Sequence, residues 1–296
     1  MVINMEIREN AFAKINLSLD VLGKRDDGYH GILSVMQSIA LYDYVTIKVV
    51  PREDYDTSIN YVKSYPTRNI AIGRGLPRDS RNTAVRAADA FFAFTGIKGF
   101  RAEITLDKHI PVGAGLGGGS SDAAAVLRGL NRLFETRLSA EFLRALGEGV
   151  GSDVPFCVEG GTVIARGRGE FLEPIAPFPN CEIVIVKPTF SVSTAELFAA
   201  FDRTKVRCHP ETNSLVAAIT DGDLHRAVRY LYNVFEDVLP PHQGAEIASI
   251  REKLLDEGAL GAVMTGTGSA VFGIFESGAI AAADKLRESY KDVFVC

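Results

Sequence analysis

A run of glycines between residues 113 and 119 constrains this chain more than any other feature. Five of these seven residues are glycine, Pro111 precedes them, and Ser120, Ser121 and Asp122 follow directly. From about Ser120 onward, apolar side chains recur at three- and four-residue steps, which predicts a helix. A glycine-rich segment that leads into a helix brings several backbone N–H groups close to the positive end of the helix dipole. This pattern is typical of a loop that binds phosphate.

Three known kinds of glycine loop can be compared with this run. Gly113, Gly115 and Gly118 satisfy the GxGxxG pattern of dinucleotide-binding proteins, but charged residues separate the run from the preceding strand, so a tight strand-to-helix turn fits poorly. The phosphate loop of P-loop NTPases needs a lysine where Gly119 stands. Protein kinases need VAIK, HRD and DFG motifs, which are absent. We expect a loop that binds phosphate through its backbone, with a cation supplied from elsewhere. A purely structural glycine loop is the alternative.

The composition is that of a folded protein without a basic surface. Of its 296 residues, 47% are hydrophobic and 23% are charged, which suits one large domain or two ordinary ones. The formal net charge of −5 argues against a nucleic-acid partner. Four scattered cysteines indicate a reducing compartment. Residues 258–275 carry no charge, but five glycines interrupt them, which favours strand–loop–strand over a membrane helix. We expect a cytoplasmic protein that binds no membrane.

Side-chain periodicity predicts an α+β protein, not a regular alternation of strands and helices. The predicted strands are 11–22, 44–50, 100–106, 182–187, 260–264 and 269–275. The predicted helices run from an Asn82 cap to Phe94, from about Ser120, and over 138–149, 193–202, 221–232, 243–257 and 278–289. We expect a long connection over residues 51–80 and an apolar strand over 155–165. Prolines near residues 174–179 suggest two domains, residues 1–165 and 166–296.

Two charged residues are candidates for chemistry. Lys14 lies between apolar neighbours on a predicted strand, with Asn16 on the same face. A lysine there is costly unless it is paired or functional, and an exposed lysine on an edge strand is the alternative. Asp153 precedes an apolar segment, where a turn or a capping aspartate is the alternative. Phosphoryl transfer uses a cation to neutralise charge and a carboxylate to accept a hydroxyl proton, and these two residues suit those roles.

Taken together, these segments resemble the GHMP kinases, a family of ATP-dependent kinases of small molecules. The resemblance spans nearly the whole chain. It is carried by Ala13–Leu17, Asp27–His30, Asn82–Ala88, Pro111–Ser121, Gly151–Pro155 and Thr265–Gly268. It implies a two-domain α+β fold, with an ATP-binding N-terminal domain like domain 2 of ribosomal protein S5 and a ferredoxin-like C-terminal domain. The active site would lie in the cleft between them.

Within this family the chain is most similar to the members that phosphorylate 4-diphosphocytidyl-2-C-methyl-D-erythritol on its 2-hydroxyl, in the non-mevalonate route to isoprenoids. The resemblance implies that Asp153 is the catalytic base and Lys14 its partner. The implied ATP-binding residues are Pro111, Val112, Gly113, Ala114, Gly115, Leu116, Gly117, Gly118, Gly119, Ser120, Ser121, Asn82 and Lys108. The implied substrate-binding residues are Asn16, Tyr29, His30 and Phe190, with Tyr29 and His30 in the segment that recognises cytidine.

ATP and Mg²⁺ are the implied cofactors, and no protein ligand for Mg²⁺ is assigned. The oligomeric state is left open between monomer and weak dimer. The chain departs from the family at Gly31, where glutamate is usual, and at Asn233–Glu236. Another GHMP kinase acting on homoserine or a mevalonate derivative, a catalytically silent nucleotide-binding protein and a Rossmann oxidoreductase remain as alternatives. Gly28–His30 favours a substrate that contains cytidine, and the presence of Lys14 and Asp153 favours an enzyme.

Overall fold

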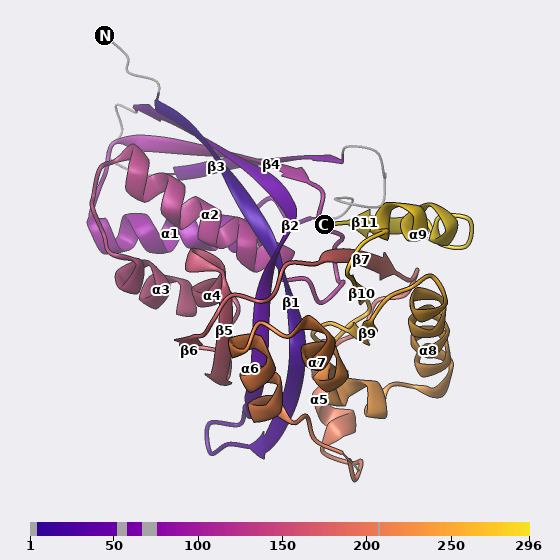
Figure 1. Ribbon diagram of the computed structural model, residues 1–296. Helices are drawn as coiled ribbons and strands as arrows, with labels where there is room; N and C mark the ends of the chain where they lie inside the picture. Colours follow the sequence, from indigo (N-terminus) through magenta and orange to yellow (C-terminus); the bar gives the residue numbers. More distant parts are fainter. Residues whose placement is uncertain (1–4, 52–57, 67–75, 207) are drawn as a thin grey trace. The chain divides into compact units, whose positions relative to one another are not determined.

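A computed structural model describes residues 5–51, 58–66, 76–206 and 208–296 (Figure 1). Contacts group the chain into two units. The first comprises Met1–Ala13, Tyr42–Val112 and Gly117–Gly160, and the second comprises Lys14–Leu41, Gly113–Leu116 and Gly161–Cys296. Two long strands, β1 (Met5–Lys24) and β2 (His30–Pro51), contribute one part to each unit. The predicted domains, residues 1–165 and 166–296, stay a prediction, because this grouping does not report which segments fold independently.

The described part of the first unit is a sheet with helices packed on it. Strand β3 (Ser58–Pro66) pairs parallel with β4 (Phe100–Lys108), and β4 pairs antiparallel with residues 44–51 of β2. The helices are α1 (Thr83–Thr95), α2 (Gly118–Leu133), α3 (Ala140–Glu148) and α4 (Val154–Glu159). Figure 1 shows α1 and α2 side by side, in agreement with the contacts between them.

Alternating side chains build the core of the first unit. Val45, Ile47 and Val49 of β2 lie in one buried cluster with Ile104 and Leu106 of β4. Each such side chain contributes about 1.5–3 kcal/mol when it is fully buried. The helices complete this cluster with alanines and aromatic rings. Because alanine is small, the backbones of α1 and α2 can approach each other closely.

Polar residues and glycines define the ends of these helices. The Oδ1 atom of Asn82 accepts a hydrogen bond of 2.9 Å from the backbone N–H of Ala84, which confirms the predicted cap of α1. Gly96 ends this helix with φ of 67°, a left-handed conformation that glycine adopts without strain. Ser139 caps α3 in the same way as Asn82 caps α1.

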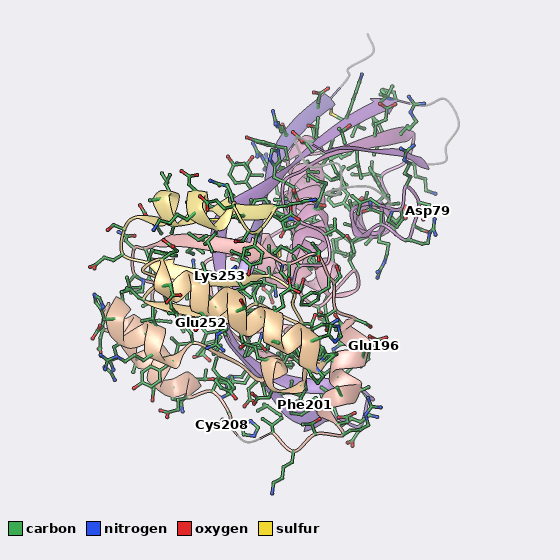
Figure 2. The ribbon with its side chains drawn as sticks, turned by 90° about the vertical axis from the view of Figure 1, so that its right-hand side faces the viewer. Asp79, Glu196, Phe201, Cys208, Glu252 and Lys253 are labelled. Carbon is green, nitrogen blue, oxygen red and sulfur yellow. The ribbon has the colours of Figure 1, made fainter. Side chains whose placement is uncertain are left out.

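The second unit contains an antiparallel sheet in the order β11-β7-β10-β9. These strands are β7 (Glu182–Lys187), β9 (Gly261–Met264), β10 (Val271–Phe275) and β11 (Asp292–Val295). The longer helices of this unit are α5 (Thr194–Phe201), α6 (Thr212–Thr220), α8 (Pro241–Asp256) and α9 (Ala279–Leu286). Figure 2 looks onto α8, with Glu252 and Lys253 labelled near the C-terminal end of this helix.

Short elements complete the second unit. Strand β5 (Thr162–Gly167) pairs antiparallel with residues 32–37 of β2, and β6 (Phe171–Pro174) pairs with β5. Strand β8 (Tyr232–Asn233) pairs parallel with β1. A short helix α7 (Leu224–Ala227) and two 3₁₀ helices, η1 (Val228–Tyr230) and η2 (Val234–Val238), lie between α6 and α8.

Most predicted elements are confirmed within the described residues. All six strands listed first in the sequence prediction are present, and the charge-free segment 258–275 contains β9 and β10 as expected. The helices predicted at 82–94, 138–149, 193–202, 243–257 and 278–289 are present with small shifts of their ends. None of the described helices combines the length and apolar character that crossing a membrane requires.

Three predictions are wrong. The expected connection over 51–80 contains β3, an edge strand that pairs with β4. The strand predicted over 155–165 starts only at Thr162, because residues 154–159 form α4 with Pro155 in its first turn, where proline is tolerated. The helix predicted over 221–232 is reduced to α7 and η1. The helix predicted from about Ser120 is present as α2, which begins at Gly118.

Phe91 and Phe94 of α1 offer a matched test of the first unit's core. Phe91 is fully buried, whereas Phe94 is 52% exposed. We expect Phe91→Ala to lower the free energy of unfolding by about 3–5 kcal/mol, because it removes a ring from a closed core. Phe94→Ala should cost less than about 1 kcal/mol. Denaturant unfolding of both variants measures this difference, and equal losses would contradict the assignment of Phe91 to the core.

Candidate active site

One face of β1 carries a row of buried polar side chains. Lys14 and Asn16 lie in this row, followed by Ser18 and Asp20, and all four are less than 9% exposed. The Lys14 ammonium donates a hydrogen bond of 2.7 Å to Oδ1 of Asn16. The Asn16 amide donates a bond of 2.8 Å to the hydroxyl of Ser34. Lys14 is therefore a buried and paired lysine, and the alternative of an exposed edge lysine is wrong.

The turn between β9 and β10 lies against this row and against part of the glycine loop. The backbone N–H of Asn16 donates a bond of 3.0 Å to the hydroxyl of Thr265. Ala270 N–H donates to the carbonyl of Ala114, and Lys14 N–H donates to the carbonyl of Leu116, each at 3.0 Å. Residues 113–116 of the loop are thus held by backbone hydrogen bonds from two other segments of the second unit.

At Gly115 the backbone of the glycine loop lies very close to the backbone of Thr265. Its φ is +77°, and a side-chain carbon at this position would lie only 2.2 Å from the carbonyl oxygen of Thr265. Real carbon atoms do not approach an oxygen so closely, so only glycine fits without movement of the backbone. The loop therefore needs glycine here for packing, in addition to the access for phosphate that its sequence indicates.

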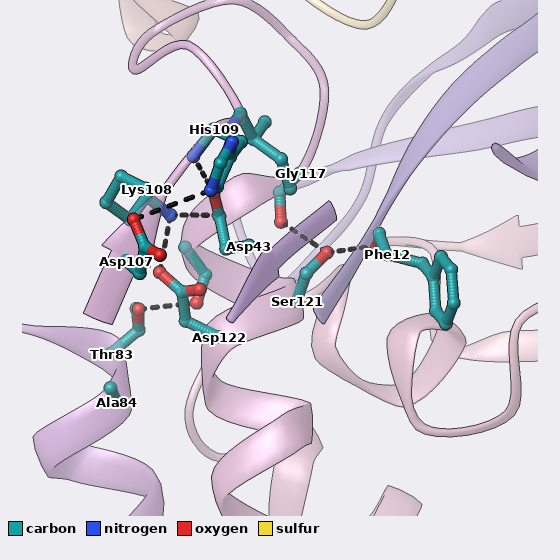
Figure 3. Close-up of polar contacts among 12 residues, drawn as sticks. Phe12, Asp43, Thr83, Ala84, Asp107, Lys108, His109, Gly117, Ser121 and Asp122 are labelled. Atoms are coloured by element: carbon teal, nitrogen blue, oxygen red, sulfur yellow. Dashed lines mark hydrogen bonds and ion pairs between the residues drawn. The ribbon is translucent and has the colours of Figure 1, made fainter. Parts of the chain in front are cut away.

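The start of α2 is fixed by backbone acceptors and not by a capping side chain (Figure 3). The hydroxyl of Ser121 donates to the carbonyl of Phe12 at 2.6 Å. Thr83 donates from its hydroxyl to the carbonyl of Gly119 at 2.7 Å. Ser121 is buried, whereas Ser120 is partly exposed. The predicted ATP contact of Ser121 stays a prediction, and the structure gives this hydroxyl a role in holding the helix.

Asn82 and Lys108, both predicted to contact ATP, are buried and bonded inside the first unit. The Asn82 amide caps α1 and donates a bond of 2.9 Å to the carbonyl of Pro77. Lys108 forms ion pairs with Asp43 and, at 2.6 Å, with Asp122 (Figure 3). Its side chain is 3% exposed. The geometry thus gives no support to a direct phosphate contact of Lys108, and the two carboxylates are residues that the sequence analysis missed.

The electrostatics of this cluster follow from its burial. Burial raises the pKa of Asp122 to about 7; the Lys108 ammonium opposes this rise, and the neighbouring Asp43 adds to it. Burial alone would favour the neutral amine of Lys108, but the two carboxylates outweigh it and raise the pKa of that ammonium. Lys108 is therefore charged at neutral pH.

Asp153 directly precedes α4, at the N-cap position, where a capping aspartate is one alternative to a catalytic one. Its side chain accepts no hydrogen bond from the backbone N–H groups of this helix. The side chain is partly exposed. The capping interpretation is therefore wrong for Asp153, and the catalytic role that the resemblance implies stays a prediction.

Tyr29 and His30 have different surroundings in the second unit. Tyr29 is 58% exposed, and the guanidinium of Arg168 lies 5.2 Å from the centre of its ring. The His30 ring lies 2.6 Å from a carboxylate oxygen of Asp202 through its Nε2 atom. It also stacks on Phe198, with ring centres 4.7 Å apart. Tyr29 thus presents an accessible ring, whereas His30 is anchored by two residues that the sequence analysis did not identify.

Phe190 packs against the core of the second unit while remaining partly exposed. Its carbonyl accepts hydrogen bonds from the hydroxyl of Ser269 at 2.6 Å and from the ammonium of Lys187 at 3.0 Å. The core-packing interpretation of this ring therefore has direct support, and its predicted stacking on substrate stays a prediction.

The chain is similar to known proteins over nearly its whole length. Residues 82–161 match the model of the GHMP kinases N terminal domain, and residues 215–292 match that of the GHMP kinases C terminal. A protein of Clostridium kluyveri named 4-diphosphocytidyl-2-C-methyl-D-erythritol kinase is 41% identical over 288 residues, which cover 96% of this chain and 97% of the relative. The chain belongs to the GHMP kinase family. A protein of the same name from Caldicellulosiruptor saccharolyticus is also 41% identical, over 96% of this chain and 94% of the relative.

Solved structures of GHMP kinases share the fold. A crystal structure of 4-(cytidine 5'-diphospho)-2C-methyl-D-erythritol kinase has a TM-score of 0.76 and 30% identity, with 98% of each chain covered. A mevalonate kinase of L. major has a TM-score of 0.70 and 18% identity, with 100% of this chain and 97% of that chain covered, and it shows the fold alone. The two-domain α+β GHMP kinase fold implied by the sequence is confirmed.

Substitution of Gly115 tests the close approach to Thr265. Gly222 is a matched control, because its φ of +71° is similar and the space around it is open. A left-handed conformation costs about 1–2 kcal/mol for alanine at either site. We expect Gly115→Ala to lower the free energy of unfolding by more than this amount and Gly222→Ala by no more. Denaturant unfolding compares the two, and equal losses would contradict the packing role of Gly115.

Proposed function

We propose that this protein transfers the γ-phosphoryl group of ATP to the 2-hydroxyl of 4-diphosphocytidyl-2-C-methyl-D-erythritol, giving the 2-phosphate and ADP, in the non-mevalonate route to isoprenoid precursors. Membership of the GHMP kinases makes it a kinase that uses ATP. The observation that carries the acceptor is the 41% identity, over 96% of the chain, to proteins named for this substrate. The same assignment is supported by the presence of Lys14, Asp153 and the Gly28–His30 segment.

Asp153 is the base in this proposal. Its carboxylate accepts the proton of the 2-hydroxyl, the hydroxyl oxygen forms a bond to the γ-phosphorus, and the bond from that phosphorus to the oxygen of ADP breaks. Its support is chemical and local. The side chain of Asp153 is partly exposed and makes no capping hydrogen bond to α4.

Lys14 stabilises the negative charge that develops on the reacting oxygens. Its support is the burial of a cation whose ammonium is already oriented by Asn16 at 2.7 Å. A side chain held in this way loses little further freedom when substrate binds. Asn16 is itself oriented by Ser34 and by the Thr265 turn, so it supports Lys14 and lies where it can orient the acceptor.

The cytidine of the acceptor stacks on Tyr29, with Phe190 as a second ring. The exposed ring of Tyr29 supports this assignment, because an aromatic face can stack on a nucleobase. His30 contributes to cytidine binding by anchoring the turn that carries Tyr29, through its contacts with Asp202 and Phe198. A homoserine or mevalonate acceptor has no base for these rings, which makes another GHMP activity the second candidate.

The glycine loop binds the phosphates of ATP through its backbone N–H groups. Among the described residues, no group of three or more histidine, cysteine, aspartate or glutamate side chains is placed to hold a metal ion. These residues do not form a cage for Mg²⁺, so we propose that Mg²⁺ arrives on the ATP phosphates. The small-molecule acceptor is the proposed partner, and the four free cysteines support a location in the cytoplasm.

An ADP-release assay with MgATP tests the proposed acceptor. The assay compares 4-diphosphocytidyl-2-C-methyl-D-erythritol with methylerythritol phosphate, homoserine and mevalonate. We expect turnover only with the cytidylyl compound, because only it contains a base for Tyr29. Turnover with another alcohol would keep the GHMP chemistry and discard the substrate. No turnover despite ATP binding would instead favour a catalytically silent protein.

Asp153→Asn tests the base. We expect ATP binding to persist while kcat falls by about 10²–10⁴-fold, because the amide cannot accept the hydroxyl proton. Asp223→Asn is a matched control, since Asp223 stands at the N-cap position of another short helix, α7, and caps it, a task that asparagine also performs. Equal loss of ATP binding and turnover in Asp153→Asn would show that Asp153 is structural.

A further inference from the structure

The two chain segments that flank the phosphate loop meet at one buried cluster of three charged side chains (Figure 3). Asp43 comes from β2, Lys108 ends β4, and Asp122 lies in the second turn of α2. The chain leaves β4 at Lys108, passes through the glycine loop and enters α2 at Gly118. Lys108 pairs with both carboxylates, so a single ammonium connects the two sides of the loop.

On the entry side, Asp43 holds the backbone directly. Its Oδ1 atom accepts hydrogen bonds from the backbone N–H groups of His109 at 2.5 Å and Ile110 at 2.8 Å. Its Oδ2 atom accepts from the Lys108 ammonium. The two residues that lead into the loop are thus tied to the same carboxylate that binds Lys108, and Asp43 is fully buried.

On the exit side, Lys108 holds the helix. Its ammonium donates a bond of 2.6 Å to Oδ2 of Asp122. A side-chain carbon at Gly118 would lie 3.0 Å from a methyl group of Ile110 and 3.5 Å from the Lys108 ammonium. The first residue of α2 is therefore seated against the entry segment and the cluster, at a distance that suits glycine.

This arrangement is a costly way to gain stability. Three ionisable side chains are removed from water, and Oδ1 of Asp122 is buried without a hydrogen-bond partner among the described residues. Replacing buried ion groups by apolar side chains of similar volume is often neutral or stabilising, so such a cluster is better explained by the geometry that it fixes. The geometry fixed here is the separation between the two ends of the phosphate loop.

We propose that Asp43, Lys108 and Asp122 are positioning residues for ATP, which set the spacing of the loop ends and thereby the arrangement of its backbone N–H groups. Lys108 acts through the loop and makes no phosphate contact of its own. This inference rests on the proposed function only for the use of ATP, and it is independent of the identity of the acceptor alcohol.

Two variants of Asp122 with side chains of similar size separate the hydrogen bond to Lys108 from the negative charge of Asp122. Asp122→Asn keeps an oxygen that can accept from Lys108, and Asp122→Leu removes it while leaving the balanced Lys108–Asp43 pair. We expect Asp122→Leu to raise KM for ATP about tenfold or more, because small displacements in a binding loop are expensive. KM for the acceptor should stay within about twofold, and Asp122→Asn should remain close to the unmodified protein, as expected for a hydrogen bond that is retained.

Glu9→Leu is the matched control for a merely structural effect. Glu9 is a buried carboxylate of the same unit, paired with Arg132 at 2.5 Å and away from the loop ends. We expect it to lower the melting temperature without a change in KM for ATP. If Asp122→Leu raises the KM of both substrates alike, leaves KM for ATP unchanged, or matches Asp122→Asn, the proposal is overturned.

A double-mutant cycle decides how Lys108 acts. If the lysine works through Asp122, adding Lys108→Met to Asp122→Leu will weaken ATP binding little beyond either single change. If Lys108 contacts phosphate itself, the fold-losses of ATP affinity from the two single changes will multiply in the double variant. That result would overturn the positioning role. Binding of a non-hydrolysable ATP analogue is measured by calorimetry, so the cycle remains informative even if the unmodified protein phosphorylates none of the proposed acceptors. Failure of the acceptor assignment is then visible separately, in the ADP-release assay.

Discussion

Close approach of backbone to backbone is the constraint on which the glycine loop depends. The carbonyl of Thr265 occupies the space where any side chain at residue 115 would stand. Two further backbone hydrogen bonds, from Lys14 and Ala270, hold the same short segment. A loop fixed in this manner keeps its own N–H groups in place without side chains. Glycine here serves rigidity through packing, although the residue itself is the most flexible of all.

Two buried lysines make different contacts in this chain. The ammonium of Lys14 donates a hydrogen bond to the neutral amide oxygen of Asn16, which is itself held by Ser34. The ammonium of Lys108 donates to two carboxylates, those of Asp43 and Asp122. Because these carboxylates come from β2 and α2, Lys108 joins two segments of backbone that are distant in sequence.

The sequence predicted the strands and helices whose side chains follow one clear period, together with the Asn82 cap. It did not predict β3, because the charges, prolines and glycines of the surrounding residues 51–80 indicated a connection. It also misassigned residues 154–159, where an apolar run without clear period suits a strand and a helix equally. For the site, the motifs predicted Lys14, Asp153 and the glycine loop, and their roles in catalysis and binding stay predictions. Asp43, Asp122 and Asp202 could not be identified, because each acts through a partner that is distant in sequence.

Residues 13–21 of β1 are buried on both faces of the strand, and the two faces have opposite character. Lys14, Asn16 and Ser18 alternate with Ile15, Leu17 and Leu19. Deleting or inserting one residue within this part of the strand would exchange the two faces, placing the lysine in an apolar core and leucines in the polar row. Evolution can therefore vary the side chains of this part of β1 but not the number of its residues.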